Sequence, residues 1–130
     1  LITFEITETA AISNLSRAIA FMKTFRELGC HFALDDFGSG LSSFGYLTTL
    51  PVDYIKIDGK LISAMVTSPI NHSIVDAVNR IAHQMHLITI AEYVEDKILI
   101  ERLRAMGVDY GQGFALAPLE PMATLLMTPH

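Results

Sequence analysis

The stretch FALDDFGSG, residues 32–40, places two adjacent carboxylates directly after a short apolar run and before two glycines. A continuous apolar run of this length, bounded by turn residues, is typical of a strand buried in a parallel sheet. The carboxyl ends of parallel strands meet at one rim, where ligands bind. Asp35 and Asp36 are therefore expected at such a rim, beside a mobile or tightly turned glycine loop.

The rest of the chain alternates apolar strand-like segments with amphipathic helical segments. Strands are predicted over residues 1–7, 30–34, 52–57, 87–91 and 108–114, and helices over residues 14–28, 42–49, 60–66, 69–86 and 95–106. Three of these helices should each turn an apolar stripe inward. The stripe of helix 14–28 is Leu15, Ala18, Ile19, Met22, Phe25 and Leu28, and the stripe of helix 69–86 is Ile74, Val75, Val78, Ile81, Ala82 and Met85. The stripe of helix 95–106 is Leu99, Leu103 and Met106. The pattern predicts an α/β fold with parallel strands covered by helices.

Bulk composition narrows the class of protein. The 130 residues, 51% of them apolar, suit one globular core. No apolar run reaches the roughly 18 residues that a membrane helix needs, and no secretory signal opens the chain, so a soluble protein is expected. The single Cys30, expected as a small buried residue at a strand start, excludes an intrachain disulfide framework and a Cys-rich zinc site. The net charge of −5 argues against DNA binding.

Polar residues recur at the predicted strand ends. They are Glu5, Asp35 and Asp36, Lys56 and Asp58, Glu92 and Gln112. Carboxylate oxygens without a Cys or His cluster favour Mg²⁺ or Mn²⁺, and adjacent aspartates could serve two ions about 3.5–4 Å apart, as in phosphodiester cleavage. The histidines are not at strand ends and are not expected to bind metal: His31, His72, His83, His86 and His130.

The ordered motifs resemble those of a known family. EITE at residues 5–8, DDFGSG at 35–40, LPVDYIKID at 50–58, AEYVE at 91–95 and QGF at 112–114 resemble the EAL domain of cyclic di-GMP phosphodiesterases. The resemblance implies a modified TIM barrel that hydrolyses cyclic di-GMP to linear pGpG with two Mg²⁺ or Mn²⁺ ions. Tyr93 stands where the family commonly has glycine, and we expect it to pack on neighbouring loops.

The resemblance also implies a role for each matching residue. Glu5 and Asp35 would bind metal, with Asp35 bridging to a second ion that Asp36 also serves. Glu92 would support the second metal and its water, and Lys56 would position or deprotonate that water. The remaining residues would support the loop or the substrate: Glu8, which would anchor the loop, with Gly38, Ser39, Gly40, Asp58 and Gln112.

The family's Glu-Ala-Leu motif and the asparagine of its next strand are absent from these residues. Five strands are also few, because such a barrel needs about eight strands and roughly 250 residues. Residues 1–130 are therefore expected to be the carboxyl-terminal portion of one EAL domain, a partial TIM-like barrel of the last five parallel strands, inactive alone. Upstream residues or a second copy should cover its open sheet edge. The expected setting is a cytoplasmic homodimer with upstream sensory or GGDEF domains and no membrane contact by this segment.

Two other functions are compatible with parts of the pattern. A degenerate EAL domain would bind cyclic di-GMP, or only a protein partner, without hydrolysis, but every acid expected in this segment is retained. A TIM-barrel lyase would form a Schiff base on Lys56. That chemistry needs a lowered lysine pKa, whereas a ring of acids would raise it.

Overall fold

The computed structural model describes residues 2–38, 44–92, 94, 97–112 and 120–121, and its strands form one sheet in the order β1-β2-β3-β4-β5-β6. The first five strands are parallel neighbours: β1 (Thr3–Thr7), β2 (His31–Phe37), β3 (Tyr54–Ile57), β4 (Ile88–Glu92) and β5 (Tyr110–Gln112). The predicted parallel α/β arrangement is confirmed. A sixth strand, β6 (Glu120–Pro121), pairs antiparallel with β5 and was not predicted.

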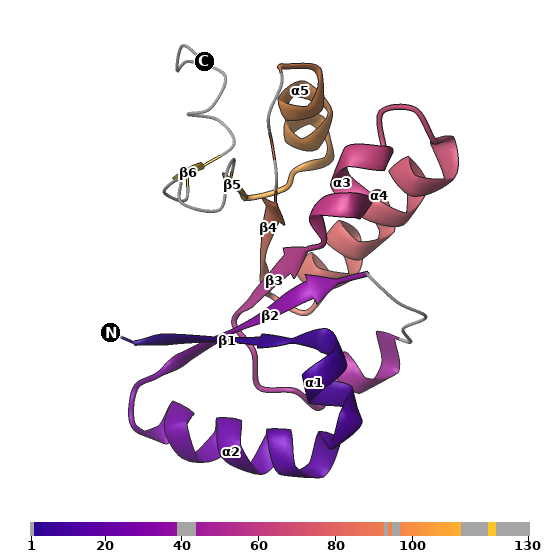
Figure 1. Cartoon of the computed structure of the whole chain (residues 1–130). Coiled ribbons are helices and arrows are strands. Elements are labelled where there is room, and N and C mark those ends of the chain that lie inside the picture. Colours follow the sequence, from indigo (N-terminus) through magenta and orange to yellow (C-terminus); the bar gives the residue numbers. More distant parts are fainter. Residues whose placement is uncertain (1, 39–43, 93, 95–96, 113–119, 122–130) are drawn as a thin grey trace.

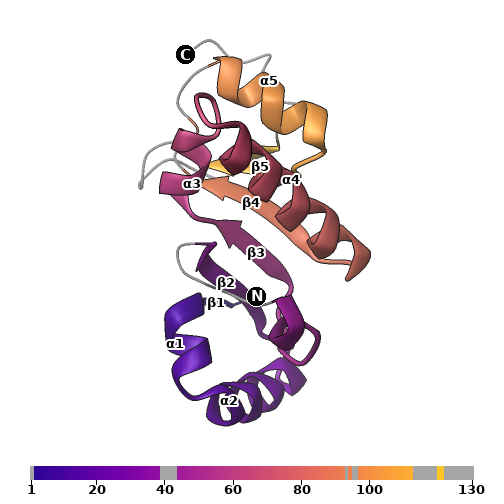
Figure 2. The same ribbon diagram turned by 90° about the vertical axis from the view of Figure 1, so that its right-hand side faces the viewer.

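Helices connect these strands (Figure 1). They are α1 (Glu8–Ser13), α2 (Leu15–Glu27), the 3₁₀ helix η1 (Phe44–Thr48), α3 (Gly59–Ala64), α4 (Pro69–Gln84) and α5 (Lys97–Met106). Helix α2 packs on β2, and α4 packs on β3 and β4 (Figure 2). No helix in the described parts of the chain has the length and apolar character needed to cross a membrane.

Capping side chains explain where α1, α2 and α4 begin. The side-chain oxygens of Thr7, Asn14 and Ser68 accept hydrogen bonds from backbone N–H groups of the first turns of α1, α2 and α4, at 3.1, 3.3 and 3.3 Å. Such caps satisfy donors that a helix start leaves without partners. Gly29 and Gly107 follow α2 and α5 with φ of +90° and +87°, as expected for glycines that end helices.

Some predicted boundaries were wrong for local reasons. Asn14 caps α2 instead of lying in it, and the separate helix α1 precedes it. The helix predicted over residues 42–49 is a 3₁₀ helix over Phe44–Thr48 within its described part. The second strand does not stop before the aspartates. It runs through Asp35 and Asp36 to Phe37, because β2 contains a register shift against β3 that accommodates an extra residue.

The core lies between the sheet and its helices. Its largest fully buried side chains include Phe32, Phe37, Met22, Leu34, Leu47, Ile55, Ile57, Ile62, Met65 and Leu103. Leu28 and Ile74, predicted to face inward, are 73% and 40% exposed. Leu28 lies beyond the last residue of α2, and Ile74 lies beside the buried Val75 at the margin of its stripe. Cys30 is half-buried instead of fully buried.

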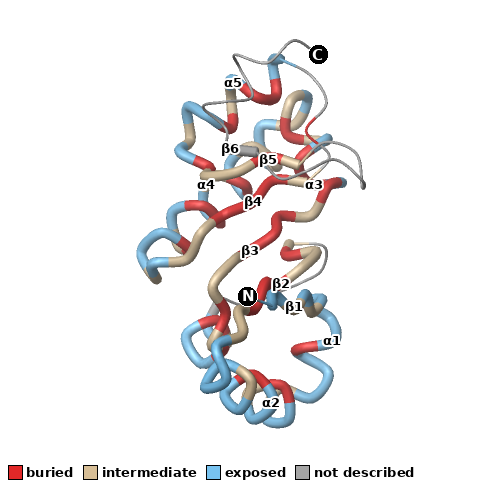
Figure 3. Tube along the Cα trace, turned by 90° about the vertical axis from the view of Figure 1, so that its left-hand side faces the viewer, coloured by how far each residue is buried: buried red, intermediate tan, exposed pale blue. Residues whose placement is uncertain are grey.

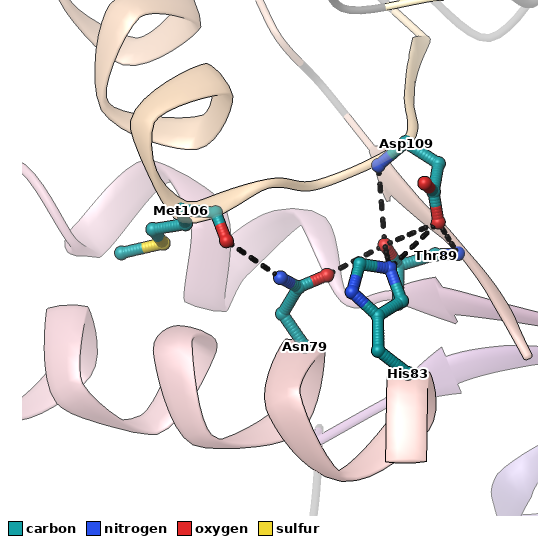
Figure 4. A network of polar contacts seen from close by, with 5 residues as sticks. All are labelled: Asn79, His83, Thr89, Met106 and Asp109. Carbon is teal, nitrogen blue, oxygen red and sulfur yellow. Dashed lines mark hydrogen bonds and ion pairs between the residues drawn. The ribbon is translucent and has the colours of Figure 1, made fainter. Parts of the chain in front are cut away.

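A polar network joins α4, β4 and the segment between α5 and β5 (Figure 4). The fully buried Thr89 hydroxyl donates to Asn79 Oδ1 at 2.7 Å and accepts from the Asp109 backbone N–H at 3.2 Å. Asn79 Nδ2 donates to the Met106 carbonyl at 2.9 Å, and Asp109 Oδ2 lies 2.8 Å from His83 Nε2. The network ties the starts of β4 and β5 to the helix between them and to α4.

The opposite face of the sheet bears the candidate site. No described helix covers this face, which Figure 3 shows from the open side. Paired residues in neighbouring parallel strands point to the same face, and one such row runs through Glu5, Ala33, Tyr54 and Ile88. Farther along the strands, Lys56 pairs with Ile90 and Glu92 pairs with Gln112. The fold thus places the predicted polar residues of different strands on one surface.

Candidate active site

An irregularity in β2 brings two adjacent acids together. Successive residues of a regular strand point to opposite faces. Between Leu34 and Phe37 the register against β3 shifts, and Asp36 adopts a left-handed φ of 54°. The Asp36 backbone N–H donates to Asp35 Oδ1 at 2.9 Å. The bulge therefore allows both carboxylates to serve one site, which is a common use of bulges beside active sites.

Asp35, Asp36 and Glu92 form the acid cluster, in which one carboxylate oxygen from each lies within 4.8 Å of the other two. Glu92 Oε1 is buried and has no hydrogen-bond partner among the described residues. A buried charged oxygen without a donor is costly unless something neutralises it. Hard carboxylate oxygens are the ligands that Mg²⁺ and Mn²⁺ prefer, so the cluster fits a divalent cation.

Burial and mutual repulsion within the acid cluster raise the pKa of two of its carboxyl groups. Burial and the negative charge of Asp35 raise the pKa of Glu92 to about 8. Burial and the charges of Asp35 and Asp58 also raise the pKa of Asp36. These shifts have the sign expected for like charges held together away from water. A cation held between the three acids would offset that repulsion.

Lys56 lies between the acid cluster and Glu5. It is 8% exposed, and its Nζ forms an ion pair with Glu5 Oε1. Burial alone would lower the pKa of Lys56, but the hydrogen bond to Glu5 and the charges of Glu5, Asp35 and Glu92 raise it. The raised pKa agrees with the expectation that argued against a Schiff-base lysine. The role predicted for Lys56, to position or deprotonate the water, stays a prediction.

A cavity of about 430 Å³ opens on the helix-free face of the sheet. Its walls come from all five parallel strands: Thr3, Glu5, Ala33, Tyr54, Lys56, Ile88, Ile90, Tyr110 and Gln112. Gln112 is the last residue of β5 and pairs with Glu92 in the sheet. Glu5 is in this wall and contacts Lys56, but it is not among the residues of the acid cluster. The metal-binding role predicted for Glu5 stays a prediction.

Glu8 lies at the start of α1 and is 2% exposed. Its Oε1 accepts from the Gly38 backbone N–H at 3.2 Å, and its Oε2 accepts from the Tyr46 hydroxyl. This arrangement fits the anchoring role expected for Glu8. The sequence analysis did not identify Tyr46 as a partner of Glu8. A tyrosine in a short apolar helix gives no sign in the sequence of the residue that it contacts. Ser39, Gly40 and Tyr93 lie outside the described residues.

The other predicted polar residues lie apart from the acid cluster or at its margin. Asp58 follows β3, and its charge acts on Asp36. His31 pairs with Asp53 at 3.4 Å and His83 pairs with Asp109 at 2.8 Å. Within the described residues, no histidine belongs to the acid cluster. His130 lies outside the described residues.

The comparisons with known proteins agree with this arrangement. The model of the EAL domain family matches residues 1–119. The chain belongs to the EAL domain family. It is 43% identical over 123 residues to the cyclic di-GMP phosphodiesterase PdeB of Shewanella oneidensis, covering 95% of this chain and 14% of that protein. It is 34% identical to the cyclic di-GMP phosphodiesterase PdeF of Escherichia coli, covering 95% of this chain and 16% of that protein.

Solved EAL domains share the fold. The PaMucR phosphodiesterase in complex with c-di-GMP superposes with a TM-score of 0.83 and 31% identity, over 95% of this chain and 50% of that one. The manganese and cy-diGMP complex of Klebsiella pneumoniae BlrP1 gives a TM-score of 0.81 and 31% identity, over 90% of this chain and 30% of that one. The chain thus spans half or less of these solved EAL chains and about one sixth or less of the curated relatives just named.

Proposed function

We propose that this EAL chain provides the catalytic rim of a phosphodiesterase that hydrolyses cyclic di-GMP to linear pGpG. The observation that carries the proposal is the acid cluster of Asp35, Asp36 and Glu92, with its buried unpartnered oxygen, beside a buried lysine. The names of the relatives and the c-di-GMP in solved neighbours support this substrate. The coverage of half of a solved EAL chain supports a contribution of part of a larger barrel, and we propose that this part is its last five parallel strands.

Each residue of the rim then has a chemical role. Asp35, Asp36 and Glu92 would hold two Mg²⁺ or Mn²⁺ ions together with Glu5. When bound, these ions supply positive charge to phosphodiester oxygens and activate water. The ammonium of Lys56 donates hydrogen bonds that orient a water or a phosphate oxygen, while Glu5 fixes its position. Gln112 donates its amide N–H from the cavity wall to an oxygen of the substrate.

Replacing Asp35 by asparagine tests the proposal. In a chain that carries these residues together with the rest of an EAL domain, Asp35→Asn keeps the shape but removes a charged oxygen ligand. We expect at least about 100-fold less pGpG, followed by chromatography with Mn²⁺ or Mg²⁺. Asp76→Asn, which alters a surface ion pair with Arg80 on α4, is the matched control and should leave the rate unchanged. Near-normal turnover by Asp35→Asn would require the two-metal assignment to be abandoned.

The same assay separates hydrolysis from simple binding. A degenerate EAL domain would bind cyclic di-GMP in equilibrium dialysis yet release no pGpG with either metal. We further propose that the domain acts in the cytoplasm as a homodimer and that sensory or GGDEF domains precede it. Crosslinking of purified protein would test the homodimer.

A further inference from the structure

Glu8 is a buried carboxylate in an unusual setting. It is 2% exposed, and none of the described Lys, Arg or His residues forms an ion pair with it. Such a group is tolerated when hydrogen bonds satisfy its oxygens. Here one bond comes from the Gly38 backbone at 3.2 Å and one from the Tyr46 hydroxyl. Glu8 therefore connects η1 to the turn after β2.

The turn that Glu8 holds lies two residues beyond Asp36 of the acid cluster. Asp36 and Gly38 both have left-handed φ angles, 54° and 91°. A Cβ atom on Gly38 would lie 2.9 Å from Leu61 Cδ2, so the turn is confined on that side. Glu8 fixes the same turn through its backbone N–H. Because Gly38 is only two residues beyond Asp36, movement of this turn would shift the Asp36 carboxylate.

We propose that Tyr46 is a positioning residue for metal binding, an inference that rests on the proposed function. Its hydroxyl holds Glu8 Oε2, which leaves Glu8 Oε1 aimed at Gly38, and the fixed turn keeps Asp36 beside Asp35 and Glu92. Residues that orient metal ligands from a second layer typically change metal affinity by about 10–100-fold when removed. Tyr46 thereby tunes the affinity of the acid cluster for Mg²⁺ or Mn²⁺.

The test removes a single oxygen atom. Tyr46→Phe keeps the ring and deletes the donor to Glu8, and we expect the Mn²⁺ dissociation constant, measured by calorimetry, to rise about 10-fold. Thr48→Val is the matched control, because it deletes an exposed hydroxyl of the same 3₁₀ helix. Among the described residues, this hydroxyl bonds to the Gly45 carbonyl at 2.9 Å. In a Glu8→Ala background, Tyr46→Phe should add less than about twofold, since the two residues act in series.

The outcomes separate this inference from the function on which it rests. If the unsubstituted protein binds no Mn²⁺, both are overturned. If it binds Mn²⁺ and Tyr46→Phe changes the constant less than twofold, or adds its full effect to Glu8→Ala, the inference alone fails. Amide exchange of Gly38 in the unsubstituted protein provides a measurement that does not depend on variant folding. Slow exchange supports the bond to Glu8, and exchange at the rate of an unstructured peptide overturns it.

Discussion

Two residues with left-handed backbone angles, Asp36 and Gly38, lie at the acid cluster. A non-glycine residue in this region costs roughly 1–3 kcal/mol and persists only where its surroundings hold it. At Asp36 the bulge of β2 and the bond to Asp35 Oδ1 provide that restraint. At Gly38 the restraint comes from the hydrogen bond to Glu8. The strained backbone at Asp36 therefore coincides with one of the proposed ligands.

The first residue-scale prediction concerns Gly38→Ala. An added Cβ must tolerate φ of +91° and also displace Leu61 Cδ2 from 2.9 Å. We expect the free energy of unfolding, measured with urea, to fall by about 3 kcal/mol, combining backbone strain and overpacking. Mn²⁺ binding should weaken as well, because the turn lies two residues beyond Asp36.

Gly29 supplies a control with nearly the same backbone angle. It has φ of +90° but no neighbouring atom within 4 Å of an added Cβ. Gly29→Ala should therefore cost only the backbone term, about 1–2 kcal/mol, and leave Mn²⁺ binding unchanged. Equal losses of stability in the two variants would show that the contact with Leu61 is unimportant.

At the scale of single residues, the sequence predicted the acids of the site but not the bulge and the hydrogen bonds that hold them in place. Asp35, Asp36 and Glu92 could be brought together because strand ends in a parallel sheet share one rim. The bulge could not be predicted, since it depends on the register between β2 and β3. The bond from Tyr46 to Glu8 spans 38 residues, and no local pattern encodes it.

Among the elements, β4 and β5 carry Glu92 and Gln112 at one end and the network of Asn79, Thr89 and Asp109 at the other. Asp109 Oδ2 accepts from the backbone N–H of Thr89 at 2.9 Å. A register slip of one residue would move side chains to the opposite face of the sheet. The network thus fixes the pairing that places Glu92 beside Gln112.

The element-scale prediction is that Thr89→Val destabilises the fold. Valine has nearly the same shape as threonine, but it leaves Asn79 Oδ1 and the Asp109 N–H without the partner that the Thr89 hydroxyl provides. Each buried group left unsatisfied costs about 1–3 kcal/mol, so we expect a loss of at least about 2 kcal/mol in urea unfolding. A loss below 0.5 kcal/mol, on the order of a surface substitution, would contradict this role for the network.

Thr24→Val in α2 is the matched control for this variant. The Thr24 hydroxyl is exposed and bonds to the Ala20 carbonyl of its own helix at 3.0 Å. We expect its removal to change the free energy of unfolding by less than about 0.5 kcal/mol.

The sequence had predicted the apolar stripe of α4 but not the buried Asn79 within it, because the burial of a polar residue depends on hydrogen-bond partners that the stripe does not reveal.

Over the whole molecule, the sheet has β1 at one edge and bears a cavity on the face that no described helix covers. The parallel order of five strands followed from the alternation of helical and strand-like segments, since adjacent parallel strands require crossovers. The short antiparallel β6 had no comparable periodic signal. Periodicity thus predicted the five parallel strands and missed α1 and β6.

The whole-molecule prediction follows from how much of a barrel these residues supply. The chain covers 50% of the solved PaMucR chain. Among the described residues, three acids form the acid cluster. The side chain of Glu5 is 52% exposed and forms an ion pair with Lys56 instead of joining that cluster. Two-metal hydrolysis requires ligands held rigidly around both ions, and misplacement by about 1 Å can cost 100-fold in rate. We therefore expect the 130 residues alone to bind Mn²⁺ weakly and to release negligible pGpG. The same residues within a chain that also carries the rest of an EAL domain should turn over cyclic di-GMP, followed by chromatography. Comparable rates for the two would show that this sheet, with its exposed edge and open cavity, is sufficient for catalysis.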